Sequence, residues 1–346
     1  MRPRAVALVL LLLILVVCAT AGPEPLAGRP LHHVEGGFRN LDPAFVRPSG
    51  WTRSTFIARR TWQSITSTRT FDASRIVNNG AALRAVPAPP SITWIGHATL
   101  LVQVDGLNVL TDPTWSDRAG PTSWIGAQRV TAPGLAFEDL PRIDVVTISH
   151  DHYDHLDLPT VKRLAADHNP LFLVPLRMKA WFADNDMHRV EELDWWEERE
   201  VRGVRFVCTP AQHFSQRSLW DGNHRLWASW AILGRERRFY HGGDTGYFAG
   251  FKEIGRRLGP FDVAALPIGA YLPPSIMRLV HTTPEEAVQA FEDLDARIIL
   301  GMHWGTFDLA DEPLDQPPVR MLAEIRRRAI APQRAWILKI GETRAW

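Results

Sequence analysis

Four potential metal ligands lie within one short stretch of this chain. The stretch 149–155 reads Ser-His-Asp-His-Tyr-Asp-His, and the apolar run 143–148 before it predicts a buried strand. The residues 158–166 after it predict a helix with Pro159 in its first turn. Imidazole and carboxylate groups on such a rigid strand-to-helix loop suit zinc or another divalent first-row metal. A polar loop with clustered histidines is the plainer alternative, but the H-x-H-x-D-H order favours a ligand role for His150, His152, Asp154 and His155.

Three isolated residues further along the chain could complete a metal site. His213, Asp244 and His303 each come shortly after an apolar, strand-like run, in a turn that contains Gly or Pro. Glycine at such a turn lets the backbone approach a metal closely. Taken singly, a packed histidine or an aspartate that forms a turn is the more common interpretation. Together, in this order after the H-x-H-x-D-H loop, the three favour a centre with two metal ions.

The order of these residues resembles the metallo-β-lactamase superfamily of dinuclear metallohydrolases. The flanking sequence is similar to a narrower branch, the N-acylphosphatidylethanolamine-hydrolysing phospholipase D group, of which the chain looks like a bacterial homologue. The segments that carry this resemblance are 94–99, 110–113, 149–156, 192–197, 242–247, 266–271 and 303–307. The resemblance implies an α/β fold of the metallo-β-lactamase type, an αββα sandwich in which two mixed sheets are flanked by helices.

Carried over to this chain, the resemblance implies two Zn²⁺ ions per chain. One ion is assigned to His150, His152 and His213, the second to Asp154, His155 and His303, and Asp244 bridges them. Paired ions can hold a hydroxide near neutral pH and clamp the attacking and leaving oxygens of an in-line displacement. Asp154, Asp244 and His281 are therefore the expected catalytic residues.

Four further residues are candidates for supporting roles. The carboxylate of Asp112, after a strand-like run, could orient a ligand histidine through its second ring nitrogen, or it could simply form an Asp-Pro turn. His97 has an active-site role or packs in a polar part of the core. His281 and Tyr271 are expected to contact the substrate, with solvent exposure at a helix entrance as the alternative for His281.

The sequence departs from the family directly after Tyr271. There the family continues with an acidic residue and Pro-Arg-Trp, whereas residues 272–277 read Leu-Pro-Pro-Ser-Ile-Met. The arginine and tryptophan that the family places near the pocket are absent at these positions. The head-group and acyl preference is therefore not predicted by the resemblance.

The chain of 346 residues is expected to have three parts. Arg2 and Arg4, the apolar run 5–17 and the small residues up to Ala21 predict a signal peptide or an N-terminal membrane anchor over 1–21. Residues 22–90 show no clear periodicity and predict an extended arm packed on the main domain. Residues 91–346 predict the catalytic domain, with short strands first and helices at 159–166, 249–258, 284–294 and 317–329.

These features predict a zinc hydrolase of the phospholipase D type, which releases phosphatidic acid from N-acyl phosphatidylethanolamine or related phospholipids. A zinc-dependent lactonase or acyl hydrolase is the alternative. A non-catalytic lipid-binding or envelope protein is disfavoured, because a structural zinc site closes with four ligands. We expect an exported protein that is periplasmic or membrane-associated in the cell envelope. Its expected partners are a phospholipid substrate and a membrane surface, and a homodimer is compatible with the sequence. The net charge of +1 disfavours nucleic acid as a partner.

Overall fold

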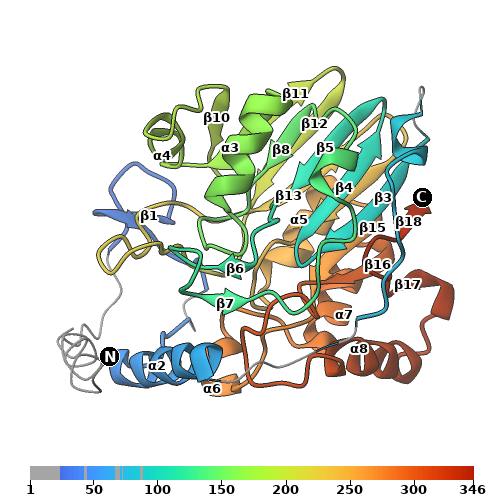
Figure 1. Cartoon of the computed structure of the whole chain (residues 1–346). Helices are drawn as coiled ribbons and strands as arrows, with labels where there is room; N and C mark the ends of the chain where they lie inside the picture. Colours follow the sequence, from blue (N-terminus) through green and yellow to red (C-terminus); the bar gives the residue numbers. More distant parts are fainter. Residues whose placement is uncertain (1–23, 43–44, 67–70, 72, 86–88) are drawn as a thin grey trace.

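Two seven-stranded mixed sheets face each other in the computed structural model, and helices cover their outer faces (Figure 1). The structure describes residues 24–42, 45–66, 71, 73–85 and 89–346. Across the first sheet lie β10 (Val190–Leu193), β9 (Leu171–Pro175), β8 (Val145–Thr147), β5 (Leu107–Thr111), β4 (Thr99–Val104), β3 (Ser91–Gly96) and β18 (Thr343–Ala345). Across the second lie β11 (Glu198–Val201), β12 (Val204–Thr209), β13 (Ser229–Leu233), β14 (Arg238–His241), β15 (Phe261–Pro267), β16 (Ala296–Met302) and β17 (Ala335–Trp336). The predicted αββα sandwich is confirmed.

The helices cover the sheets in two groups. They are α2 (Gly50–Thr66), α3 (Leu158–Asp167), α4 (Lys179–Ala183), α5 (Gly250–Leu258), α6 (Pro274–Met277), α7 (Pro284–Asp293) and α8 (Gln316–Arg327). Residues of α3 and α4 pack on the outer face of the first sheet, and residues of α5, α7 and α8 pack on the second. Two small hairpins pair β1 (His33–Val34) with β2 (Gly37–Phe38) and β6 (Arg118–Ala119) with β7 (Ala127–Gln128).

The strands are apolar on both faces because each sheet is covered on both sides. In β4, Leu100 and Val102 point into the space between the sheets, whereas Leu101 packs with the outer helices. This alternation follows from the two-residue repeat of a strand. The helix α7 begins with a capping box, in which the Thr283 side chain accepts a hydrogen bond from Glu286 N at 3.2 Å.

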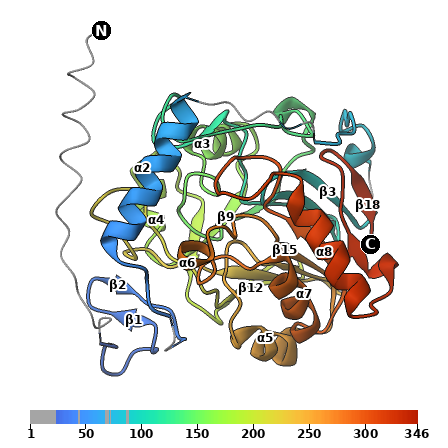
Figure 2. The same cartoon turned by 90° about the horizontal axis from the view of Figure 1, so that it is seen from below.

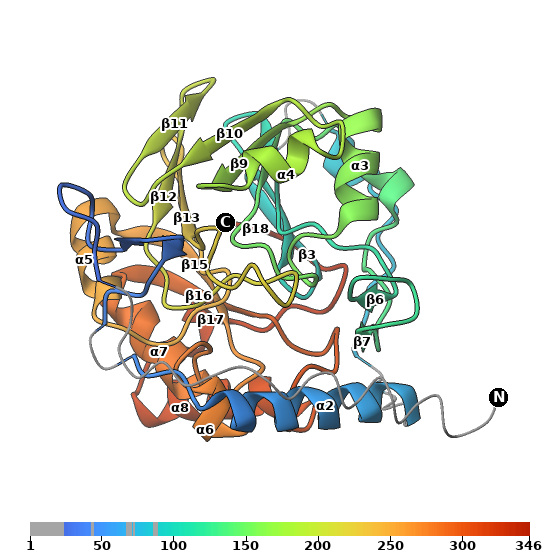
Figure 3. The same cartoon turned by 90° about the vertical axis from the view of Figure 1, so that its left-hand side faces the viewer.

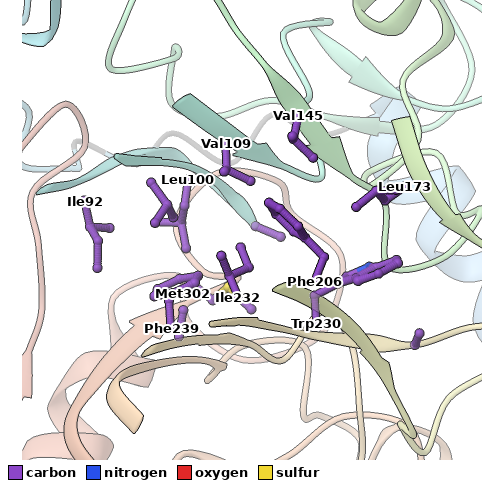
Figure 4. Packing of buried hydrophobic residues seen from close by; sticks show 14 of the residues in the cluster. Ile92, Leu100, Val109, Val145, Leu173, Phe206, Trp230, Ile232, Phe239 and Met302 are labelled. Carbon is purple, nitrogen blue, oxygen red and sulfur yellow. The ribbon is translucent and has the colours of Figure 1, made fainter. Parts of the chain in front are cut away.

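Large side chains fill the space between the two sheets (Figure 4). Phe206 and Trp230 from the second sheet pack in the same cluster as Leu100 and Val109 from the first, and all four are fully buried. The Trp230 indole also donates a hydrogen bond to Ile148 O at 2.8 Å. This hydrogen bond joins β13 of the second sheet to Ile148, the residue before the histidine-rich loop.

The N-terminal arm contains a helix that the sequence did not predict. The expected boundary at residue 91 coincides with the start of β3, but the arm is not extended throughout, because it includes the 17-residue α2. This helix runs past β6 and β7 and beside α6 (Figures 1 and 3). Trp51 and Trp62 are exposed on it, at 66% and 59%. Its large aromatic residues therefore do not mark the buried face, and the usual amphipathic pattern is hidden.

Polar and apolar contacts fix the arm to the domain. In α2, Phe56 packs against the cluster that contains Met277 and Ala310. Nearer the N-terminus, His32 and His33 each place Nε2 at 2.7 Å from the Asp194 carboxylate. The arm therefore contacts the domain at both ends. Figure 2 shows α2 and the β1–β2 hairpin on the same side of the molecule.

The predicted signal peptide or anchor, residues 1–21, lies outside the described residues. Among the helices that the structure describes, none combines the length and the apolar character needed to cross a bilayer.

We expect Phe206→Ala to lower the free energy of unfolding by about 3–5 kcal/mol, because it leaves a cavity between the sheets. Arg205→Ala is a matched control on the same strand, since Arg205 is exposed and pairs with Glu198 at the surface. Denaturant unfolding of both variants measures the difference. A loss below about 1 kcal/mol for Phe206→Ala would contradict the assigned core.

Candidate metal centre

The predicted ligands meet at one end of the two sheets. The loop after β8 carries His150, His152, Asp154 and His155, and single residues follow β12, β14 and β16 at His213, Asp244 and His303. The strands β14, β15 and β16 are parallel, so their carboxyl ends lie at the same edge. Gly243 has φ +56, and a Cβ there would lie 2.5 Å from Ser149 Cβ. Only glycine lets the β14 turn approach the histidine loop this closely.

The first group of side chains consists of His150, His152, His213 and Asp244. One ligand atom from each lies within 4.8 Å of every other. His150 Nε2 and His213 Nε2 each lie 3.8 Å from Asp244 Oδ2. Three of the side chains are buried, and His152 is partly exposed.

The second group consists of His97, Asp154, His155 and His303, all buried. His155 Nε2 and His303 Nε2 each lie 3.5 Å from Asp154 Oδ2. The same two nitrogens lie 3.1 and 2.9 Å from the Asp244 carboxylate. Asp244 is therefore next to both groups: Oδ2 faces His150, His213 and His155, and Oδ1 faces His303.

Donor atoms in this space suit a bound cation. His155 Nε2, His303 Nε2 and Asp244 Oδ1 are buried and form no hydrogen bond within the described chain. Buried imidazole nitrogens and a carboxylate that meet at 2.9–3.1 Å without hydrogen-bond geometry suit a cation held between them. Imidazole nitrogen and carboxylate oxygen are the ligands of zinc and related divalent ions, and the residues fit such ions.

The charges of these groups support the same conclusion. Burial raises the pKa of Asp244, but His303, His155 and His281 outweigh it and hold that pKa well below its usual range. Burial lowers the pKa of His303, but Asp244 and Asp154 outweigh it and raise the pKa to about 9. Burial holds the pKa of His150 well below its usual value, so this imidazole is neutral, which is the form that binds a metal. The ionised Asp244 and the neutral His150 suit a cation, whereas His303 would release its proton on binding one.

Asp112 and His97 both contact predicted ligands. The Asp112 carboxylate accepts hydrogen bonds from Ser149 N and from His155 Nδ1, both at 2.7 Å. His155 is thereby oriented with Nε2 toward the centre. His97 Nε2 lies 2.9 Å from Asp154 Oδ2, and its ring is 3.9 Å from that of His303.

Three residues at or beside the centre have a strained backbone. Asp112, His97 and His303 have positive φ angles of 37°, 53° and 61°. Residues other than glycine adopt such angles at a cost, and they persist where the surrounding contacts hold them.

The two predicted substrate contacts occupy different surroundings. His281 Nδ1 lies 3.9 Å from Asp244 Oδ2, and its ring is 5.1 Å from that of His213 and 5.5 Å from that of His303. The Tyr271 hydroxyl instead bonds to Gln316 in α8 at 2.6 Å. His281 thus borders the centre, whereas a contact of Tyr271 with substrate stays a prediction.

Several contacts that support the ligand loop were not predicted from the sequence. Asp151 is fully buried between His150 and His152, and its carboxylate pairs with Arg225 Nη1 at 2.9 Å. Arg217 Nη1 donates a hydrogen bond to Asp151 O at 2.7 Å. Both arginines are more than 60 residues away in the sequence, so no local pattern could have revealed them. A place for His241 near the centre was also not predicted. Its Nε2 lies 3.9 Å from Asp112 Oδ2.

Comparison with known proteins agrees with this geometry. Residues 107–304 match the β-lactamase superfamily domain. An N-acyl-phosphatidylethanolamine-hydrolyzing phospholipase D of Caenorhabditis elegans is 44% identical over 245 residues, which are 67% of this chain and 68% of that protein. A metal-dependent hydrolase of Methanopyrus kandleri is 30% identical over 257 residues, 73% of this chain and 98% of that protein.

Solved structures show the same fold. A metallo hydrolase from the archaeon Ignicoccus hospitalis superimposes with a TM-score of 0.56 at 22% identity, over 73% of this chain and 97% of that chain. The family resemblance expected from the sequence is confirmed. The domain match, the relatives and the cluster of His and Asp ligands agree that the chain belongs to the β-lactamase superfamily of metal-dependent hydrolases.

Proposed function

We propose that the chain is a zinc-dependent phosphodiesterase of the phospholipase D type, which releases phosphatidic acid from N-acyl phosphatidylethanolamine and related phospholipids. The worm relative bears the name of this activity. The observation that carries the proposal is the position of Asp244 between two groups of ligands. Two divalent ions offset by few carboxylates leave surplus positive charge, which suits an anionic phosphodiester better than a neutral lactone.

Seven residues would hold the two ions. His150, His152 and His213 form one set, Asp154, His155 and His303 form the other, and Asp244 belongs to both. When bound, ions of this kind supply Lewis acidity and lower the pKa of a water that can attack phosphorus. The chain itself keeps the ligands in place: Asp112 orients His155, and His97 holds the carboxylate of Asp154.

His281 is the proposed contact with the substrate phosphate. Its Nδ1 forms no hydrogen bond within the described chain, although the side chain is buried beside Asp244. Burial lowers its pKa to about 4, so the imidazole is neutral near pH 7. In the tautomer with hydrogen on Nδ1, it can donate one hydrogen bond to a phosphoryl oxygen without adding charge. This role orients the lipid rather than providing the nucleophile.

The proposal includes a membrane surface as the place of reaction. Trp51 and Trp62 are 11 residues apart in α2, which places them on one side of the helix. Trp220, in the loop after His213, is 88% exposed. Amphipathic indole rings favour the head-group region of a bilayer. Export through residues 1–21 would bring the protein to such a surface and remains part of the proposal.

We expect the zinc-loaded protein to produce phosphatidic acid from N-acyl phosphatidylethanolamine, and to cleave other glycerophospholipids measurably. Turnover should require lipid in micelles or bilayers. Mass spectrometry of the products after incubation with mixed phospholipids measures this, with the Asp244→Asn protein as the control for contaminating lipases. Efficient turnover of a simple lactone without cleavage of any phospholipid would replace the proposal with the lactonase alternative.

We expect Asp244→Asn to lower turnover by about 100-fold or more and to reduce the metal content, because the change removes the charge next to both sets of ligands. Asp262→Asn is a matched control: Asp262 is a buried carboxylate on β15 that bonds to Arg238 N and Arg297. Elemental analysis and turnover are compared for both variants. Wild-type metal content and activity in Asp244→Asn would rule out a shared carboxylate.

A further inference from the structure

Arg47, in the N-terminal arm, places a positive charge at the edge of the candidate metal centre. Its guanidinium carbon lies 4.5 Å from the centre of the Phe214 ring. That ring in turn lies 4.5 Å from the ring of His152 and 4.8 Å from the ring of His213. His152 is the partly exposed member of its group, and Phe214 and Arg47 beside it are partly buried. Arg47 therefore lies at the exposed side of this group.

The charge of Arg47 has no anionic partner within the described part of the chain. The side chain is partly buried, and it forms neither an ion pair nor a hydrogen bond with a described residue. Burial, and then the nearby charge of Arg53, lower its pKa to about 10, so Arg47 remains a cation at neutral pH. By contrast, Arg59 pairs with Asp311 and Arg60 pairs with Asp308, each at 2.6 Å. Two neighbouring cations without a carboxylate are unfavourable unless an anion joins them.

The arm holds Arg47 in this position through α2. Phe56 packs with Met277 of α6 and with Ala310, and Arg60 pairs with Asp308. Figures 2 and 3 show α2 passing alongside α6. The arm therefore rests on α6 and on the segment around Ala310.

We infer that Arg47, with Arg53 beside it, forms a subsite for a lipid phosphate group at the entrance to the metal centre. The inference rests on the proposed phospholipase function. A guanidinium presents a planar fork of N–H donors that fits phosphate oxygens. Its packing over the Phe214 face holds the guanidinium beside the ring, and its N–H groups have no acceptor among the described residues. A bound phosphate would offset the two like charges.

Replacement of Arg47 tests the subsite. We expect Arg47→Met to raise KM for a short-chain N-acyl phosphatidylethanolamine in neutral detergent micelles by about tenfold, with kcat changed less than about twofold, because a charge-assisted hydrogen bond is lost in binding. Arg47→Lys should restore part of the loss. Arg59→Met is the control, since it removes the same charge from another part of the same arm, in α2, where Arg59 pairs with Asp311. Equal KM values for wild type and Arg47→Met both in neutral micelles and with added phosphatidylglycerol, or an equal rise in Arg59→Met, would overturn the inference.

The composition of the micelles distinguishes two sources of the bound phosphate, the substrate and a neighbouring lipid. An increase in KM in neutral micelles identifies the phosphate of the substrate itself. An increase that requires added phosphatidylglycerol identifies a neighbouring lipid of the surface. Both results support a phosphate subsite, and no increase in either condition overturns it.

A binding measurement separates this inference from the proposed function. Calorimetric titration with sn-glycerol 3-phosphate requires no turnover, and we expect weaker binding to Arg47→Met than to wild type and to Arg59→Met. If wild type cleaves no phospholipid but Arg47→Met still binds the probe more weakly, the proposed function fails and the anion subsite stands. If binding is unchanged, the subsite is wrong whatever the substrate. Equal melting temperatures of the three proteins establish that α2 is still docked.

Discussion

A buried carboxylate between two clusters of histidines is the constraint on which this structure depends. Asp244 lies 2.9 Å from His303 Nε2, 3.1 Å from His155 Nε2 and 3.8 Å from His150 Nε2. A charge in such a position is costly unless other charges compensate it. The surrounding imidazoles and the divalent ions proposed here provide that compensation. The strand β14, the turn with Gly243 and the approach to Ser149 all serve to place this one group.

The packing of the two sheets positions the metal ligands. The ligand loop follows β8 of the first sheet, whereas Asp244 and His303 follow strands of the second. Hydrogen bonds join the two sheets at this loop, from Trp230 to Ile148 O and from Ala228 N to Ser149 O, both at 2.8 Å. The position of the ligands is therefore set by the packing between the sheets. Asp151 and its arginines fix the loop from the opposite side.

Local patterns in the sequence predicted much of this arrangement, and long-range contacts account for the rest. The strands before the ligands and the helices α3, α5, α7 and α8 were recognisable from their periodicity and from Pro and Thr at helix starts. For Asp112, the sequence left two alternatives open, a contact with a ligand histidine and a simple Asp-Pro turn. It could not decide between them because the partner, His155, is 43 residues away. The helix α2 was missed because its exposed face, not its buried one, carries the tryptophans. Neither the Tyr271–Gln316 bond nor the place of Arg47 over Phe214 has a local signature.

The central claim is that the seven clustered residues hold two divalent ions on either side of Asp244. Anomalous diffraction from crystals of the zinc-loaded protein, recorded above and below the zinc edge, tests it most directly. The account predicts two peaks, one among His150, His152 and His213 and the other among Asp154, His155 and His303, with Asp244 next to both. A single peak at full occupancy, or peaks only at other residues, would contradict it.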